Sequence, residues 1–512
     1  MLIESSIDWQ AQMQAVGRYL MPEVILTLMA CALLVLDVVT PQSKKRWIGY
    51  VSIGGVIASG FSLFWMWYTL RPATQFFAFS DMFVIDNLAI AFKAIFLVAA
   101  ALSIAISIKY LDVEEDQHGE YYALVLFSTV GMMVIASGSD LLSLYIGMEL
   151  MALSVYVLVG YMKRDRRSNE ASMKYFLMGA FSSGILLYGI SLFYGVTGST
   201  NLVKIANALG GEAAKSDLLI VVATILIAAG LCFKIAAVPF HMWAPDAYEG
   251  APTSVTAFMS VGVKAGSYAL FARIFLSGLY PLYDNWVILL GIIAAITMTW
   301  GNVGAVTQTN IKRLMAYSSI AHAGYILLGL IAGNEWGYWG IVVYLMAYTF
   351  MNLGAFGVII ALRRKGVMGD QLDDLNGLIK TQPWLAVLML VFMLSLAGIP
   401  PTAGFAGKFL LFGGLIKRAA TDATANPGRA WWLGALAVVA VLNTAVSLYY
   451  YFNFVKAMFV SETTEKAPLS LSYGLKIALG VSLVLTLFIG VYPTPFINLA
   501  SSAASSFAGL LK

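Results

Sequence analysis

The stretch GIPPTAGFAGKFLLFG, residues 398–413, decides the fold of this chain. It is as apolar as a membrane span, yet it contains two adjacent prolines, four glycines and Lys408. Pro400 and Pro401 lack backbone donors and clash with the preceding turn, and the glycines loosen the same segment, so a helix should break here. Broken backbone at membrane depth is tolerated only where it is buried in protein or lines a cavity. The stretch therefore predicts an interrupted membrane helix that does more than anchor the chain.

The composition of the whole chain indicates an all-α polytopic membrane protein. Of its 512 residues, 60% are hydrophobic and 11% are charged. Apolar runs of about twenty residues, each able to cross a hydrocarbon core of roughly 30 Å, recur from end to end. They predict about fourteen transmembrane helices at 21–39, 47–70, 84–109, 121–137, 139–161, 171–195, 217–240, 252–276, 285–303, 308–331, 338–362, 382–416 (long and broken), 430–458 and 470–492.

The charged loops predict the orientation of the chain in the membrane. The first residues, MLIESSIDWQAQ, are polar and acidic, so we expect no cleavable signal. The even number of predicted spans places both termini on one side of the membrane. Loops rich in lysine and arginine normally face the cytoplasm, whereas acidic residues have little influence on orientation. The basic loops all fall on the face opposite to the termini, so the termini are expected outside. The net charge of +4 reflects this bias, and no basic patch with interleaved aromatic residues indicates nucleic-acid binding. The basic loops are KKR at 44–46, KRDRR at 163–167, KR at 312–313 and RRK at 363–365.

Several ionisable residues lie well inside the predicted spans. An intramembrane charge costs roughly 2.5–3.5 kcal/mol even on the lenient insertion scale, so such residues usually mark an ion or proton path. The alternatives are a static buried ion pair for the central charges, a hydrogen-bonded structural histidine, and a lysine that extends to the interface. The candidates are Glu149, Lys234, Lys264 and Lys408 at the centre of spans, His322 within a span, and Lys174 near the start of one.

A second helix break is predicted at Pro239, five residues after Lys234. Lys234 and Lys408 thus each lie beside a broken helix, about five spans apart. This spacing suggests two repeated units of five helices, and an odd-numbered unit repeated once is inverted in the membrane.

Lysine and glutamate together suit proton transfer. A desolvated lysine releases and rebinds a proton near neutral pH. At an effective dielectric near 20, an opposite charge contributes roughly 3.3 kcal/mol at about 5 Å and half of that at about 10 Å. A movement of Glu149 by a few ångströms would therefore load or unload Lys234, provided that the two are neighbours.

The chain resembles the antiporter-like proton-translocating subunits of respiratory complex I, the proton-pumping NADH:quinone oxidoreductase. The motifs that carry the resemblance are FKIAAVPFHMWAPDAYEGAPTSVTAFMSVGVKAG (233–266), NIKRLMAYSSIAHAGYILLG (310–329) and SLAGIPPTAGFAGKF (395–409). The resemblance implies fourteen helices with two inverted five-helix repeats, helices 4–8 and 9–13, in which helices 7 and 12 are broken. It implies three N-terminal helices at 1–120, repeats at 121–280 and 281–460, and helix 14 at 461–512.

The resemblance also implies roles for the candidate residues. Glu149 and Lys234 match the helix 5 glutamate and helix 7 lysine that gate proton loading, and Lys408 matches the terminal site on helix 12. Lys264 and His322 match the central polar axis, and Lys174 matches a helix 6 lysine. One subunit type of the family has a glutamate on helix 12 and another has a long lateral helix. Lys408 and the chain end at Lys512 favour the type with neither.

Cofactors and metals are expected elsewhere in such a complex. Cys31 and Cys232 form no cluster or disulfide pattern, no GxGxxG follows a strand, and the spacing of His241, Asp246 and Glu249 suits no standard metal site. The resemblance implies NADH, FMN, iron–sulfur clusters and quinone in the complex, other membrane-arm subunits as partners, and a bacterial inner membrane. A multisubunit cation/proton antiporter and a membrane-bound hydrogenase remain alternatives.

Overall fold

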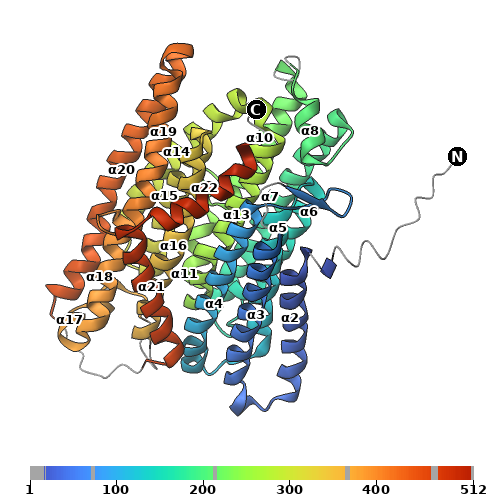
Figure 1. Cartoon of the computed structure of the whole chain (residues 1–512). Coiled ribbons are helices and arrows are strands. Elements are labelled where there is room, and N and C mark those ends of the chain that lie inside the picture. The colour runs from blue at the N-terminus through green and yellow to red at the C-terminus, as the bar shows by residue number, and fades with distance from the viewer. Residues whose placement is uncertain are drawn as a thin grey trace.

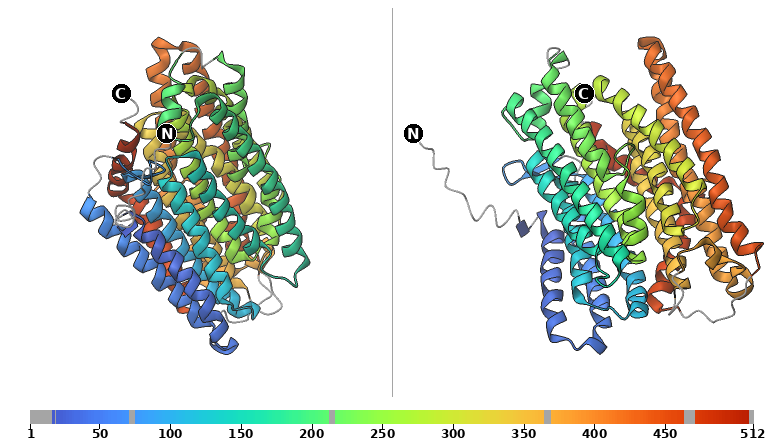
Figure 2. Two further views of the ribbon diagram at one scale, coloured as in Figure 1. Left: turned by 90° about the vertical axis from the view of Figure 1, so that its right-hand side faces the viewer. Right: turned by 180° about the vertical axis from the view of Figure 1, so that it is seen from behind.

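Helices run from one end of the molecule to the other, roughly along one axis (Figures 1 and 2). The computed structural model describes residues 16–17, 19–70, 75–211, 216–363, 369–462 and 471–508. Within these residues, 12 helical segments are long and apolar enough to cross a membrane. They are α2 (Met21–Val39), α3 (Arg46–Leu70), α4 (Asn87–Glu114), α5 (Gly119–Ser137), α6 (Leu141–Val159), α7 (Arg166–Thr197), the joined segment Thr253–Gly278, α14 (Tyr283–Val306), α15 (Ile311–Ala332), α16 (Glu335–Leu362), α20 (Pro427–Phe459) and α21 (Tyr473–Val491).

Two further apolar paths through the bundle are interrupted. The first consists of α10 (Leu218–Lys234) and α11 (Trp243–Gly250), and the second of α18 (Pro383–Ala397) and α19 (Ala403–Ala425). Each gap contains the prolines that the sequence singles out, because a proline can neither donate to the helix nor pack behind its preceding turn.

Helix ends need partners for their free amide groups, and short polar side chains supply them. Asp86 accepts a hydrogen bond from the amide of Ala89 at the start of α4, and Asp140 accepts one from Leu142 at the start of α6. Asp217 does the same for Leu219 in α10. These caps explain why acidic residues occur at the ends of apolar runs.

The centre of the bundle is formed by the segment Thr253–Gly278 with α15 and α16. In the most apolar stretch of Thr253–Gly278, 100% of the residues are buried, and in those of α15 and α16 the share is 94%. In the outer helices α2 and α20 the share is only 33%. The joined segment comprises α12 (Thr253–Phe258), a π-helical turn (Met259–Val263), α13 (Lys264–Arg273) and a second π-helical turn (Ile274–Gly278). Lys264 and His322 therefore lie on the helices that are most enclosed by protein.

Several elements were not predicted from the apolar runs. Strands β1 (Phe76–Ala78) and β2 (Phe83–Ile85) form an antiparallel hairpin, and α8 (Leu202–Ala208) follows α7. The helix α22 (Thr494–Ala508) packs against α4 and α16 and crosses the bundle obliquely (Figure 1). Some helices also extend beyond their apolar runs; α4 continues to Glu114 because polar residues extend a helix outside the hydrocarbon layer. The remaining short elements are Gln42–Lys44, Tyr280–Leu282, Leu372–Leu375 and α17 (Leu378–Thr381).

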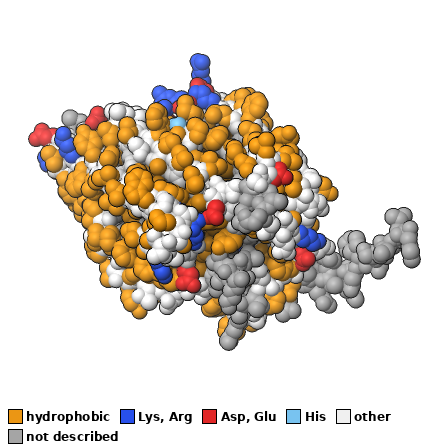
Figure 3. Space-filling model, turned by 90° about the horizontal axis from the view of Figure 1, so that it is seen from above, with side chains coloured by type: hydrophobic (Ala, Val, Ile, Leu, Met, Phe, Trp, Pro, Cys, Tyr) orange, Lys and Arg blue, Asp and Glu red, His pale blue; other side chains and the backbone are white. Residues whose placement is uncertain are grey.

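The two ends of the bundle differ in charge. Viewed from above, one end is mostly hydrophobic or uncharged, and its charged side chains are scattered (Figure 3). At the other end, Lys163, Lys312 and Arg363 come from three of the predicted basic loops and line one polar hollow. Three of the four predicted basic loops therefore lie at one end, as predicted, apart from residues 364 and 365, which fall outside the described part of the chain.

Candidate functional site

Glu149 and Lys234 lie on either side of one hydroxyl group. Ser183, on α7, donates a hydrogen bond to Glu149 Oε1 over 2.5 Å, and Lys234 Nζ donates to Ser183 Oγ over 3.3 Å. Lys234 also donates to the hydroxyl of Tyr156 over 3.4 Å. Lys234 is the last residue of α10 and is buried, whereas Glu149 is half-buried on α6. The structure thus places Glu149 and Lys234 close together, which the sequence alone could not establish.

Lys264 lies at the centre of the bundle, directly after a π-helical turn. Such turns often occur at functional sites, because the extra residue redirects the following side chain. Lys264 Nζ contacts the backbone carbonyl and the hydroxyl of Ser319, and it lies 5.6 Å from the ring centre of Tyr348. A cavity of about 10 Å³, measured for the centre of a water-sized sphere, lies between Lys234 and Lys264. That is close to the space one water molecule needs.

His322 lies between Lys264 and Lys408, next to tyrosines that face each lysine. Its Nδ1 is hydrogen-bonded to the hydroxyl of Tyr344, and its Nε2 lies 3.0 Å from the hydroxyl of Tyr451. Its ring centre lies 5.1 Å from that of Tyr348, which also faces Lys264, and 5.8 Å from that of Tyr325, which also faces Lys408. The two hydrogen bonds suit a structural histidine as well as a proton carrier.

Lys408 lies against the interrupted end of α18. Its Nζ donates to the carbonyl of Leu396 over 3.2 Å and to that of Ala397 over 3.0 Å. These are among the last carbonyls of α18, which have no partner within the helix because it ends at Ala397. The same Nζ lies 4.9 Å from the ring centre of Tyr325. The break in the opening sequence stretch thus supplies the oxygen atoms that hold the buried lysine.

Lys174 lies at the surface, with 47% of its side chain exposed. It forms ion pairs of 2.9 Å with Glu170 and with Asp246. Asp246 and Glu249 both accept hydrogen bonds from Arg313. Lys174 thus belongs to a surface network that ties α7 and α11 to α15, away from the central lysines.

Among the described residues, the two most enclosed ion pairs were missed by the sequence analysis. Lys93 Nζ lies 2.6 Å from Glu23 Oε1, with side chains 0% and 5% exposed. Arg273 donates two hydrogen bonds of 2.7 Å to Asp86 and further ones to the carbonyl of Ala136. Each partner lies within about two turns of a helix end, where a charge is normally expected to reach water.

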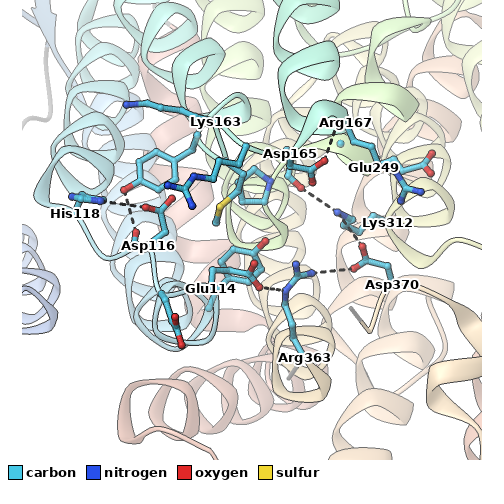
Figure 4. A pocket seen from close by; sticks show the side chains of 18 of the residues that line it. Glu114, Asp116, His118, Lys163, Asp165, Arg167, Glu249, Lys312, Arg363 and Asp370 are labelled. Carbon is cyan, nitrogen blue, oxygen red and sulfur yellow. Dashed lines mark hydrogen bonds and ion pairs between the residues drawn. The ribbon is translucent and has the colours of Figure 1, made fainter. Parts of the chain in front are cut away.

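A large polar vestibule opens at the basic end of the bundle (Figure 4). Its volume is about 880 Å³. Arg363 pairs with Glu114 and Asp370, and Lys312 pairs with Asp370 over 3.4 Å. Burial lowers the pKa of Arg363, but Tyr110, Glu114 and Asp370 raise it above its ordinary value, so the guanidinium stays charged.

Buried hydroxyl side chains occur along the helical segment between this vestibule and Lys264. The vestibule is lined by Ala251 and Pro252, directly before α12. Thr253, Thr256 and Ser260 are buried, and the three-residue spacing places Thr253 and Thr256 on one face of α12. Ser260 lies in the π-helical turn that precedes Lys264. The hydroxyl of Thr253 has no hydrogen-bond partner among the described residues. A buried polar atom of this kind normally bonds to water.

Metal ligation is not indicated in the described part of the chain. There, no group of three or more histidine, cysteine, aspartate or glutamate residues is placed to hold a metal ion. Cys31 is exposed and Cys232 is buried in α10, and both are free thiols. The site therefore consists of ionisable and hydroxyl side chains arranged through a membrane bundle.

Buried lysines at interrupted helices define the class of protein, a polytopic membrane protein with the interior of an ion or proton translocator. Residues 138–424 match the family described as NADH:quinone oxidoreductase/Mrp antiporter, transmembrane. The chain is 49% identical over 508 residues to NADH-quinone oxidoreductase subunit N 1 of Koribacter versatilis, covering 96% of this chain and 97% of the relative. It is 50% identical over 490 residues to subunit N 2 of Solibacter usitatus, covering 94% and 96%. The chain belongs to the NADH-quinone oxidoreductase subunit N family, which confirms the resemblance drawn from its motifs.

Solved structures share the fold. A chain of respiratory complex I from Thermus thermophilus with bound aureothin superimposes with a TM-score of 0.77 at 32% identity, covering 94% of this chain and 100% of that one. A chain of the Mrp complex from Dietzia gives a TM-score of 0.79 at 23% identity, covering 96% and 100%. At that identity the second comparison speaks for the fold alone.

Proposed function

We propose that this chain is the proton-translocating subunit N of the membrane arm of NADH:quinone oxidoreductase. The observation that carries the proposal is the series of ionisable groups that runs from the half-buried Glu149 through the buried Lys234, Lys264 and His322 to the buried Lys408. Buried charges of this kind are costly and are found where protons or ions pass. The proposed reaction of the whole complex is electron transfer from NADH to quinone, which drives protons through this chain.

The finer architecture is part of the same proposal. The interrupted pairs α10–α11 and α18–α19 would be crossings 7 and 12 of fourteen, and residues 121–280 and 281–460 would form two inverted repeats. The vestibule end would face the cytoplasm of a bacterium, with both termini outside its inner membrane. NADH, FMN, iron–sulfur clusters and quinone would be bound by neighbouring subunits of the complex and not by this chain.

The proton path that we propose has two branches to the centre. Protons would be taken up from the vestibule and pass along Thr253, Thr256 and Ser260 to Lys264. The pair of Glu149 and Lys234 would exchange protons with Lys264 through the small cavity between the two lysines. This use of the vestibule is supported by its volume and by the unpartnered hydroxyl of Thr253.

The test replaces the two lysines at the interrupted helices. We expect Lys234→Ala and Lys408→Ala each to lower NADH-driven proton pumping at least tenfold while the complex still assembles. The control is Lys204→Ala, which removes an exposed lysine in α8 and should pump normally. Pumping is measured as acidification of inverted membrane vesicles per assembled complex. Normal pumping by both buried-lysine variants would refute the proposal.

Cation/proton antiport is an alternative function, because a chain of the Mrp complex shares this fold. The native complex, extracted in mild detergent through a tag on this chain, separates the two functions. We expect flavin, an iron–sulfur signal and NADH:quinone reductase activity to copurify. Copurification with membrane subunits alone would favour the antiporter, and a hydrogenase activity in the extracted complex would favour the remaining alternative.

A further inference from the structure

We infer that Ser183 is a positioning and proton-relay residue between Glu149 and Lys234, an inference that rests on the proposed function. Its hydroxyl is the one group in the described part of the chain that is hydrogen-bonded to both side chains. Glu149 and Lys234 themselves form no ion pair within 4 Å among the described contacts. Ser183 is therefore the side chain that bridges the two by direct hydrogen bonds.

The direction of the hydrogen bonds suits a relay. Ser183 donates its proton toward Glu149 Oε1 over 2.5 Å and accepts from Lys234 Nζ over 3.3 Å. The short first bond is typical of a hydroxyl donating to a carboxylate. Tyr156 also accepts from Lys234, but the structure records no hydrogen bond from Tyr156 to Glu149.

The transfer step balances without any further reactant. One N–H bond of the Lys234 ammonium breaks as its proton forms an O–H bond on Ser183 Oγ. The original Ser183 proton passes at the same time to Glu149 Oε1. The products are a neutral amine, an unchanged hydroxyl and a neutral carboxylic acid, and the reverse step restores the charges.

Close helix packing holds Ser183 in this place. A Cβ atom on Gly230 of α10 would lie 2.6 Å from Leu186 Cβ of α7, so only glycine allows α10 to approach this closely. Lys234 follows Gly230 by one helical turn and therefore points at the same part of α7. A Cβ atom on Gly179, one turn before Ser183, would lie 2.0 Å from the Tyr156 hydroxyl, so glycine also makes room for the tyrosine.

The chain contains a matched control next to the relay residue. Ser182 lies on the same helix and is as buried as Ser183, at 5% exposure, but its hydroxyl donates to the carbonyl of Gly230 over 3.1 Å. Ser182→Ala therefore removes a buried interhelical hydrogen bond without touching an ionisable group. Ser183→Ala removes the bridge, and Ser183→Thr restores a hydroxyl at the same position.

The experiment measures proton pumping and NADH:quinone reductase activity in vesicles, each divided by the amount of assembled complex. We expect Ser183→Ala to lower the pumping rate roughly tenfold, which is less than the roughly 10²–10⁴-fold contribution of a fully positioned acid–base group. Ser182→Ala should stay within twofold of the unchanged protein, and Ser183→Thr should recover to within about threefold. Equal pumping by Ser183→Ala and Ser182→Ala overturns the inference.

A spectroscopic readout covers the case in which the threonine methyl group disturbs assembly. The carboxyl band of Glu149 is identified as the infrared difference band that Glu149→Gln removes. We expect this band to shift in Ser183→Ala and to stay in place in Ser182→Ala, and an unshifted band in both overturns the inference. Failure of the relay is distinguishable from failure of the proposed function, because only the latter predicts normal pumping by Lys234→Ala.

Discussion

Gly404 tests whether the contact between α18 and α19 holds Lys408 in its working position. Gly404 is the second residue of α19, and its amide donates to the Ser395 hydroxyl over 3.1 Å. A Cβ atom at this position would lie 1.8 Å from the Ser395 carbonyl oxygen, a backbone atom, whereas real Cβ atoms essentially never approach closer than 3.0 Å. Gly404→Ala must therefore move the two helix ends apart by about 1 Å.

The displacement acts directly on the lysine. Leu396 and Ala397, which accept from Lys408 over 3.2 and 3.0 Å, follow Ser395 immediately. Stretching by about 1 Å breaks both bonds, and each hydrogen bond to a charged group contributes roughly 1.5–3 kcal/mol. Overpacking itself costs roughly 1–3 kcal/mol. We expect Gly404→Ala to lower the thermal stability of the assembled complex and to reduce pumping more than tenfold.

The assay compares Gly404→Ala with Gly434→Ala. Gly434 lies in α20, where an added Cβ would meet no atom within 4 Å, and alanine favours a helix by up to about 1 kcal/mol. Stability is measured as the reductase activity that remains after heating, and pumping as protons moved per NADH oxidised. If both variants melt and pump alike, the tight contact at the break and its hold on Lys408 are refuted.

Three further predictions address the other polar contacts. Arg273→Leu should destabilise the protein by roughly 3–5 kcal/mol, because it leaves a buried carboxylate without its partner, and loss of assembled complex on native gels is the measure. Tyr344→Phe removes the hydrogen bond to His322 and should cost only about 0.5–1.5 kcal/mol of stability while pumping falls severalfold; unchanged pumping would favour a structural histidine. Lys93→Leu should impair assembly, and Glu23→Leu added to it should restore most of the loss, since an apolar pair often replaces a buried ion pair without cost.

The sequence could predict those features that a single segment encodes. Hydropathy located the apolar runs, and prolines located the gaps next to Lys234 and Lys408, because both signals act along the chain. The sequence carries no comparable signal for which segments lie next to each other in the folded bundle. Ser183 is one of many serines in apolar helices, and its position between two ionisable groups depends on how α6, α7 and α10 pack.

Charges near the ends of spans were the harder case. Glu23 occupies the first turn of α2, and Lys93 lies in the second turn of α4, so both resemble interfacial residues in the sequence. The structure encloses them because neighbouring helices surround these ends. Lys174 shows the opposite outcome: it also lies near the start of its helix but stays at the surface, paired with Glu170 and Asp246.

The two lysines at the interrupted helices both lie beside the C-terminal end of a half-helix, although their order in the sequence differs. Lys234 precedes its break, whereas Lys408 follows its break, so the two motifs differ along the chain. In space, Lys234 occupies the last turn of α10, and Lys408 reaches back to the last carbonyls of α18. The Lys408 ammonium thus lies at the negative end of a half-helix, which stabilises a cation by about 0.3–1 kcal/mol and by up to about 2 kcal/mol when partly buried. The Lys234 ammonium is instead hydrogen-bonded to the hydroxyls of Ser183 and Tyr156. At Lys408, interrupting the helix therefore creates the partner for a buried charge, and this requirement explains why two prolines and a lysine occur together in this otherwise apolar stretch.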